Sequence, residues 1–225
     1  MGYAMVSGGK PDMAAPVTGI LLSSIAEGSI VKLNENGSPV EFYVAKHDYE
    51  SALNGEGRTL LIRKDTYDIR SWNSANNAYA MSDIDSWLND EYKSILDHDV
   101  QDAISTTKFY YTLGNGNETI TTLERSVFLP SSKEMNKTSA FTNSEGNAFP
   151  AYSVFRNSDR TYWTRTPVLY DANAGATSTT LVVGILTNGN FGYYLCSGTF
   201  SSRPVFTLPA TAYFDETTLI FKGVA

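Results

Sequence analysis

The sequence has one cysteine, no long apolar run and no cluster of basic residues. Because Cys196 has no second cysteine to pair with, neither an intrachain disulfide nor a zinc cage built on several cysteines can form. A membrane-spanning helix needs about 20 consecutive apolar residues, and no such run exists. The 17 basic residues are dispersed among 24 acidic ones, giving a formal charge of −7. We therefore expect neither nucleic-acid binding nor membrane insertion.

Histidine is scarce as well. His47 and His98 lie in unrelated segments, and no spacing typical of metal ligands surrounds them, so no metal or other cofactor is expected. The Gly-x-Ser-x-Gly motif of serine hydrolases is missing too. Two carboxylates far apart in sequence can still meet in space as a glycosidase pair, so a carbohydrate-active enzyme remains an alternative. The candidate acids for such a pair all lie on one predicted helix, where helix capping and contact with solvent also account for acidic residues. They are Asp83, Asp85, Asp90 and Glu91.

The pattern of apolar residues and turn formers predicts a strand-rich chain with few helices. Two β-hairpins are expected, around the Asn-Gly turns at 34–37 and 114–117, because Asn-Gly favours the positive φ angles of a tight turn. The individual strands are predicted at 30–33, 39–46, 59–63, 109–111, 118–123, 162–167, 181–186, 191–196 and 203–209. The first 27 residues have no basic region followed by an apolar core, so they predict an extended arm and no secretory signal.

The clearest helix is predicted for residues 82–96, where apolar residues recur at helical spacing and Ser82 with Asp85 resembles a capping box. Asp97 or Asp99 is expected to cap a short second helix that ends at Ile104. A helical turn is expected near 133–135, followed by a polar loop over 136–161. Together these elements predict one α+β domain over residues 28–209, preceded by the arm (1–27) and followed by a tail (210–225).

Four residues near the C-terminal end are expected to form a structural frame. Arg165 and Arg203 are each followed by a proline within two positions, and a guanidinium in such a setting typically ties strands to buried carbonyls or acids. Trp163 is expected in the core, with its indole nitrogen bonded to an internal acceptor. Pro204 completes the frame.

The segment between these anchors has a different composition. It is rich in Tyr, Asn and Ser, the mixture by which antibody paratopes combine large contact areas with adaptable hydrogen bonding. We expect it to form a ligand-binding face, although an ordinary polar hairpin explains the same composition. The residues assigned to this face are Tyr170, Asp171, Asn173, Ser178, Asn188, Asn190, Phe191, Tyr193, Tyr194, Ser197 and Thr199.

Four ordered motifs carry a family resemblance: SDIDSWLN (82–89), VFLPS (127–131), YWTRTP (162–167) and SRPVFTLP (202–209). Over roughly residues 28–209 the chain resembles a family of uncharacterised domains common in gut Firmicutes and their prophages, with a W-x-R-S-P motif and a later V-R-P. The chain departs from that pattern at Thr166, where Ser is typical, and at Ser202, where Val or Phe often precedes Arg-Pro.

Such domains look like relatives of the C-type lectin fold, which formylglycine-generating enzymes and the variable proteins of diversity-generating retroelements share. The resemblance therefore implies a C-type-lectin-like (formylglycine-generating-enzyme-like) fold. In the variable proteins, the segment before the last core strand is diversified for ligand binding, so the resemblance implies that the same segment binds ligand here. The oxidase branch needs a pair of active-site cysteines, and Cys196 is alone.

We therefore expect a non-catalytic domain of a phage or prophage tail-associated protein that binds a host surface protein or glycan. It would be made in the bacterial cytoplasm and act in the virion or outside the cell after release. The alternative is a structural virion protein. In that case the segment between Arg165 and Arg203 would contact other virion proteins, or further copies of the chain in an oligomer.

Overall fold

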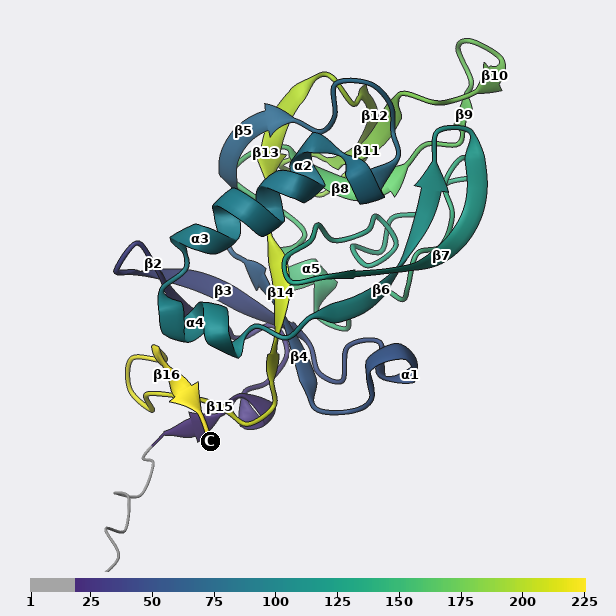
Figure 1. Cartoon of the computed structure of the whole chain (residues 1–225). Helices are drawn as coiled ribbons and strands as arrows, with labels where there is room; N and C mark the ends of the chain where they lie inside the picture. Colours follow the sequence, from purple (N-terminus) through teal and green to yellow (C-terminus); the bar gives the residue numbers. More distant parts are fainter. Residues whose placement is uncertain (1–18) are drawn as a thin grey trace, which may run out of the picture.

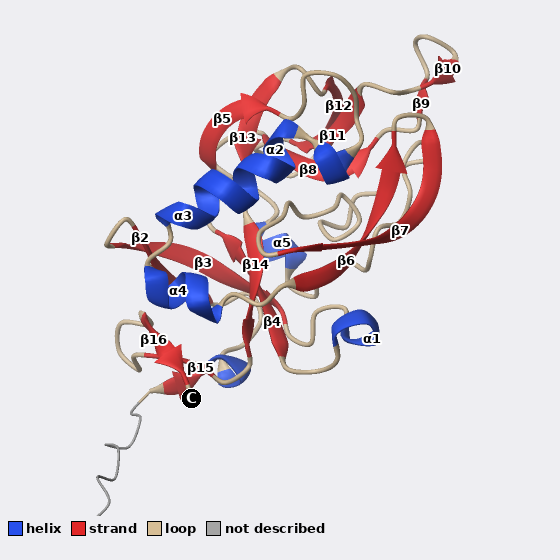
Figure 2. Ribbon diagram, viewed as in Figure 1, coloured by secondary structure: helices blue, strands red, loops and turns tan. Residues whose placement is uncertain are grey.

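The computed structural model describes residues 19–225 and shows a mixed α+β fold rich in strands (Figures 1 and 2). Two sheets dominate, one of four strands in the order β14-β4-β3-β2 and one of five in the order β12-β11-β8-β13-β5. A long hairpin, β6 (Thr107–Gly114) with β7 (Asn117–Arg125), lies at the side. The strand-rich α+β class predicted from the sequence is confirmed.

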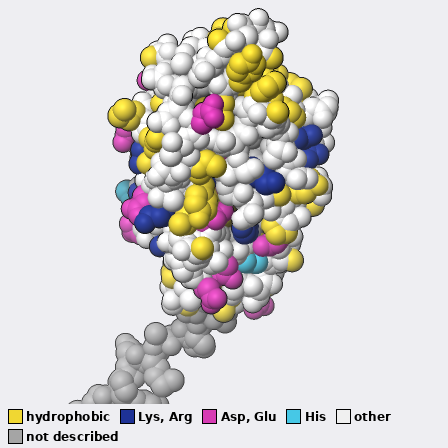
Figure 3. Space-filling model, turned by 90° about the vertical axis from the view of Figure 1, so that its right-hand side faces the viewer, with side chains coloured by type: hydrophobic (Ala, Val, Ile, Leu, Met, Phe, Trp, Pro, Cys, Tyr) yellow, Lys and Arg dark blue, Asp and Glu magenta, His cyan; other side chains and the backbone are white. Residues whose placement is uncertain are grey.

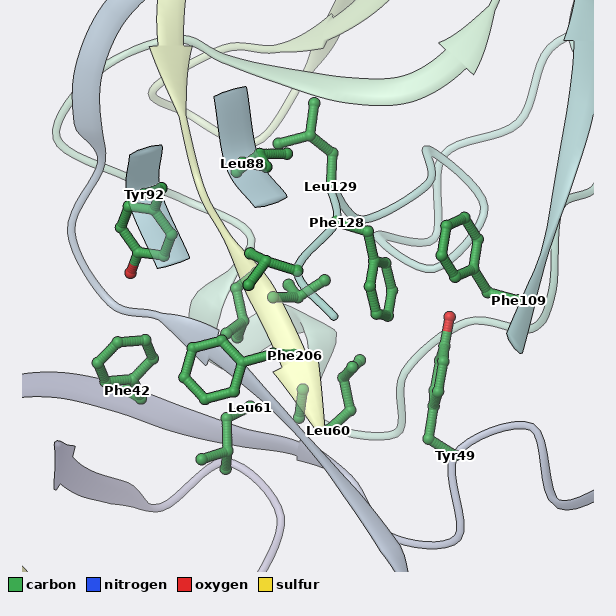
Figure 4. Close-up of a cluster of buried hydrophobic side chains, with 14 of the residues drawn as sticks. Phe42, Tyr49, Leu60, Leu61, Leu88, Tyr92, Phe109, Phe128, Leu129 and Phe206 are labelled. Carbon is green, nitrogen blue, oxygen red and sulfur yellow. The ribbon is translucent and has the colours of Figure 1, made fainter. Parts of the chain in front are cut away.

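The four-stranded sheet contains β2 (Ile30–Glu35), β3 (Ser38–Lys46), β4 (Arg58–Arg63) and β14 (Val205–Pro209). The predicted β2–β3 hairpin forms, and its turn residues Asn36 and Gly37 have φ values of 49° and 74°. Beside this sheet Phe206 packs against Phe42 with their ring centroids 5.4 Å apart (Figure 4). The same close-up shows Tyr49 next to this apolar cluster.

The five-stranded sheet contains β5 (Tyr67–Ser71), β8 (Tyr162–Pro167), β11 (Leu181–Ile185), β12 (Phe191–Leu195) and β13 (Thr199–Ser202). The central strand β8 carries the YWTRTP motif and is buried along its whole length. It runs antiparallel to β11 and parallel to β13, so β12 and β5 are the two outer strands. The short pair β9 (Tyr170–Asp171) and β10 (Ala176–Thr177) projects from the top of the molecule (Figure 1).

The predicted helix at 82–96 is present over 83–95 and contains a π-helical turn. It comprises α2 (Asp83–Trp87), the π-helix η3 (Leu88–Tyr92) and α3 (Lys93–Ile95), and the Ser82 hydroxyl caps it by accepting from the Asp85 amide. The side-chain amide of Asn89 donates to the Asp85 carbonyl, the partner that its own backbone N–H would have in an α-helix. A side chain that enters the hydrogen-bond ladder in this way explains the wider turn.

The second helix is α4 (His98–Ala103), and Asp97 stands at its N-cap position. Neither predicted capping bond forms as expected. Asp97 accepts instead from the Gly37 amide in the β2–β3 turn, and Asp99 accepts from the adjacent Val100 amide. The long-range bond to the hairpin competes successfully with the local cap.

Short helical elements complete the fold: η1 (Leu22–Ser24), α1 (Ser51–Asn54), η2 (Tyr79–Met81) and α5 (Tyr152–Phe155). Of these, α5 interrupts the segment predicted as an irregular loop over 136–161. The turn expected near 133–135 is present, and Ser131 and Glu134 cap it reciprocally.

The first and last described segments are built into the domain. Within the expected arm, residues 1–18 lie outside the described range, whereas Ile20–Leu21 forms β1. In the expected tail, β15 (Ala212–Phe214) pairs with both β1 and β16 (Phe221–Val224), and Phe214 is fully buried. Residues on both sides of 28–209, among them Leu22 and Phe214, therefore belong to the buried core cluster.

Candidate ligand-binding face

Arg165 lies at the centre of a fully buried ionic network. Its two terminal nitrogens bond Glu134 in bidentate fashion at 2.8 and 2.9 Å, and its Nε and Nη1 donate to the Tyr110 and Leu129 carbonyls. Glu134 also accepts from the Tyr49 hydroxyl at 2.6 Å. Four of the five N–H donors of the guanidinium thus have internal acceptors, and β8 is fixed to the segment that follows β7.

A second buried carboxylate, Glu145, faces the same guanidinium at 3.9 Å. It accepts from the Thr112 amide and from the Thr166 hydroxyl, so the threonine of the YWTRTP motif has a definite role. Burial raises the pKa of Glu145, although Arg165 opposes that shift. Burial likewise raises the pKa of Tyr49 well above its usual value.

The other frame residues are also buried. Arg203 donates from Nε to the Arg63 carbonyl at 3.0 Å and from Nη1 to the Phe155 carbonyl, and its guanidinium lies 5.0 Å from the Tyr162 ring centroid. The Trp163 indole donates to the Arg70 carbonyl at 3.0 Å. The Pro204 carbonyl accepts from the Arg63 amide, which joins β4 to the start of β14.

Four partly exposed aromatic residues gather beside the outer strand β12, and we call Phe141, Tyr170, Phe191 and Tyr193 the aromatic face. Phe191 and Tyr193 project from the same side of β12, because alternate residues of a strand do so, and their ring centroids are 5.7 Å apart. The Phe141 ring lies 5.6 Å from Tyr170 and 6.4 Å from Tyr193. Tyr170, 40% exposed, extends this group toward the β9–β10 hairpin.

Tyr194 projects from the opposite side of β12. Its ring packs 4.5 Å from Phe200 and 6.4 Å from Trp163, centroid to centroid. Gly184 and Gly192 make room for it, since a Cβ added at either position would lie within 2.9 Å of the Tyr194 side chain. Tyr194 therefore belongs to the packing of the frame, although it was assigned to the same face as Tyr193.

The remaining predicted binding residues are divided among four places. Asp171 and Asn173 lie in the β9–β10 hairpin, where the Asp171 carboxylate accepts from the Asn173 amide, and Asn188 and Asn190 form the β11–β12 turn in the same manner. Buried Ser178 accepts from the Leu181 amide. Ser197 and Thr199 lie in and after the turn that leads from β12 to β13. Since β11 and β8 separate β12 from β13, Thr199 at the start of β13 does not join the aromatic face.

Beside Thr199 a shallow hollow of about 220 Å³ opens, lined by Ile69, Arg160 and Phe200 among others. Ile69 is 52% exposed there. Phe141 was not predicted from the sequence, because it lies in the Ser- and Asn-rich segment 136–161, where no periodicity separates it from the other aromatic residues, Phe149, Tyr152 and Phe155.

The acids and histidines weighed for chemistry mostly have structural partners. Asp85 is ion-paired with Arg125 at 2.7 Å, and Asp83 accepts from the Ser74 amide. The two His47 ring nitrogens lie 2.9 Å from the Thr59 hydroxyl and the Ile25 carbonyl. Within residues 19–225 no group of three or more His, Cys, Asp or Glu side chains has an arrangement that can hold a metal ion. Over the same range no helix has the length and apolarity to cross a membrane.

Comparison with known proteins gave one match. A sequence profile of a family described as a domain of unknown function (DUF6273) matches residues 56–210, which is more than half of the chain. This range runs from just before β4 to the end of β14 and includes both the frame and the aromatic face. Neither a curated protein nor a solved structure matches.

Proposed function

The chain belongs to the DUF6273 family, and from its own residues we propose that it is a non-catalytic ligand-binding domain. We further propose that the domain has a C-type-lectin-like fold and acts in a phage or prophage tail-associated protein, where it binds a host surface protein or glycan. The observation that carries the proposal is the aromatic face, held at an outer strand by a fully buried frame.

The division between frame and face supports a binding role. Trp163, Arg165 and Arg203 have no exposed surface, and their hydrogen bonds are directed to internal carbonyls or acids. Phe191 and Tyr193, on the strand two places from β8 in the sheet, stay partly exposed although they are large and apolar. Rigid support beneath exposed aromatic side chains lowers the entropy cost of binding, because the side chains are already ordered before the ligand arrives. Matured antibody paratopes have the same arrangement.

The two adjacent tyrosines of β12 provide the experiment. Tyr193→Ala removes a ring from the aromatic face and is expected to abolish binding to a panel of gut Firmicute strains, with little change in melting temperature. Tyr194→Ala empties the space over Gly184 and Gly192 and is expected to lower stability by at least about 2 kcal/mol. Tyr213→Ala, a partly exposed tyrosine of the terminal sheet, is the matched control.

Cell binding by labelled protein and thermal melting are measured on the same samples. Retention of wild-type binding by Tyr193→Ala would contradict the proposed site. Wild-type protein that binds no strain of a panel spanning the main gut Firmicute lineages would contradict the proposed function.

A second candidate function, a structural virion or oligomer-interface protein, is favoured by the outer edge of β12. Residues Phe191–Leu195 carry no charge, and Leu195 is 56% exposed. The opposite edge strand β5, in contrast, carries Asp68 and Arg70. Uncharged edges readily pair with another strand. Sedimentation that shows a dimer for wild type and a monomer for Leu195→Lys would favour this candidate, and a wild-type monomer at high concentration would exclude it.

A further inference from the structure

Two cations without acidic partners lie beside the aromatic face. Among the described residues, neither Lys137 nor Arg156 has a carboxylate within 4 Å, although the chain as a whole carries a charge of −7. Burial lowers the pKa of Lys137, and the neighbouring Arg156 lowers it further. The two like charges are thus close enough to repel each other, and within residues 19–225 neither forms an ion pair with a carboxylate.

Arg156 is held in place by the fold. Its backbone amide donates to the Tyr152 carbonyl, its own carbonyl accepts from the Tyr162 hydroxyl at 2.9 Å, and its guanidinium lies 5.0 Å from the Tyr152 ring centroid. Its Nη1 donates to the Met135 carbonyl at 3.4 Å, and its Nε is buried without a hydrogen-bond partner. Among residues 19–225 no hydrogen bond occupies Nη2, so this end of the guanidinium keeps unused donor capacity.

Arg156 lies beside the turn that leads into the aromatic face, and Lys137 lies near Arg156. Gly189 in the β11–β12 turn lies against Arg156, because a Cβ added there would be 2.9 Å from the Arg156 Nε, and Phe191 follows two residues later. Lys137 precedes Phe141 by four residues. Figure 3 views the side of the molecule that carries β7 and the β9–β10 hairpin, where hydrophobic, basic and acidic side chains all reach the surface.

Aromatic rings and cations select different parts of a ligand. The four partly exposed rings pack against one another at tilted or edge-on angles, so together they offer apolar ring surface to a ligand. Aromatic ring surface suits the apolar faces of sugar rings. Lysine and arginine bind carboxylate and phosphate oxygens through charge-assisted hydrogen bonds.

From this juxtaposition we infer that the ligand is an acidic glycan, whose sugar rings contact the aromatic face while its carboxylate or phosphate groups bind Lys137 and Arg156. This inference rests on the proposed binding function and narrows it to one ligand class. The negative charge of the ligand also compensates the repulsion between the two cations, so that binding and local stability are coupled.

Three polymers test the inference by titration calorimetry: polygalacturonate, which carries carboxylates, poly(glycerol phosphate) teichoic acid, which carries phosphates, and neutral dextran. Wild-type protein is expected to bind one of the two anionic polymers, and the polymer that binds identifies the anionic group. Lys137→Gln with Arg156→Gln is expected to weaken that binding by at least about tenfold, since hydrogen bonds between charged groups are among the stronger polar contacts. The charge-matched control, Lys32→Gln with Lys222→Gln, is expected to bind like wild type.

Equal binding of dextran, no binding of either anionic polymer, or unchanged affinity of the Lys137→Gln/Arg156→Gln variant would each overturn the inference. Cell binding separates this failure from failure of the proposed function. If Tyr193→Ala loses cell binding while the double variant keeps it, the binding function stands and the acidic ligand is excluded. If wild type binds no cells, both proposals fail. Melting temperatures near that of wild type ensure that the substitutions act at the surface.

Discussion

Replacing Arg165 with Met gives the sharpest test of the buried network, because methionine keeps much of the side-chain bulk and removes the charge. Glu134 would lose both bonds of a fully buried ion pair, and the Tyr110 and Leu129 carbonyls would lose their donors. Removing one partner of a buried pair costs about 3–5 kcal/mol, and a buried unsatisfied acceptor about 1–3 kcal/mol. We expect a loss of at least about 4 kcal/mol, a large part of the roughly 5–15 kcal/mol that stabilises a typical domain.

The loss is also expected to depend on pH. Arg165 opposes the rise in the pKa of Glu145, so its removal raises that pKa further above the value in the unfolded chain. A carboxyl group with a raised folded-state pKa contributes stability that is present below its unfolded pKa and is lost as the pH rises through the folded pKa. The variant should therefore be destabilised less at pH 5 than at pH 8.

Guanidinium chloride unfolding at both pH values measures these differences, with the fluorescence of the buried Trp72 and Trp163 as the signal. Arg165→Lys keeps the charge but not the bidentate geometry, so its stability should fall between those of wild type and Arg165→Met. A loss below about 1 kcal/mol for Arg165→Met, or a loss that is equal at pH 5 and pH 8, would refute the energetic role given to this network.

Two further predictions concern the same core and the hairpin turns. Burial and the nearby Glu134 raise the pKa of Glu50, so its ionised form is unfavourable in the folded protein. Glu50→Gln should therefore melt at a higher temperature than wild type at pH 8 and at a similar temperature at pH 4. An equal effect on the melting temperature at both pH values would contradict this. Gly37→Ala should cost about 1–2 kcal/mol for its left-handed backbone alone, whereas Gly114→Ala should cost more in chemical denaturation, since its Cβ would lie 2.3 Å from the Asn77 carbonyl oxygen. Equal losses in the two alanine variants would show that this close approach relaxes without cost.

The elements that sequence predicted well depend on local signals. The Asn36–Gly37 turn requires positive φ at both residues, and asparagine followed by glycine supplies it. The Ser82 cap and the apolar spacing after it likewise identify the helix that begins at Asp83. The π-helical turn was not predictable, because it depends on where the Asn89 side chain finds its partners, and one of these is the distant Val127 carbonyl.

The elements that were missed are fixed by distant partners. Strand β5 has no distinctive apolar pattern and exists because it pairs with β13, more than 120 residues later in the chain. The same reason explains the candidate site. Composition identified Phe191 and Tyr193, but Phe141 and Arg156 join them only through tertiary contacts. Alternation along β12 was available from the sequence and could have separated Tyr194 from Tyr193.

The small sheet β1-β15-β16 brings the first and the last described strands to the same end of the molecule, on either side of β15, and Figure 1 shows the β9–β10 hairpin at the other end. A tether, tag or fused partner attached after Val224 would therefore leave from the end opposite the aromatic face. Immobilisation through the C-terminus should leave that face free for ligand, so surface-based binding assays and multivalent display on a particle are both geometrically feasible. Several copies on such a particle would point their aromatic faces outward together, and weak individual contacts would add up to strong adhesion.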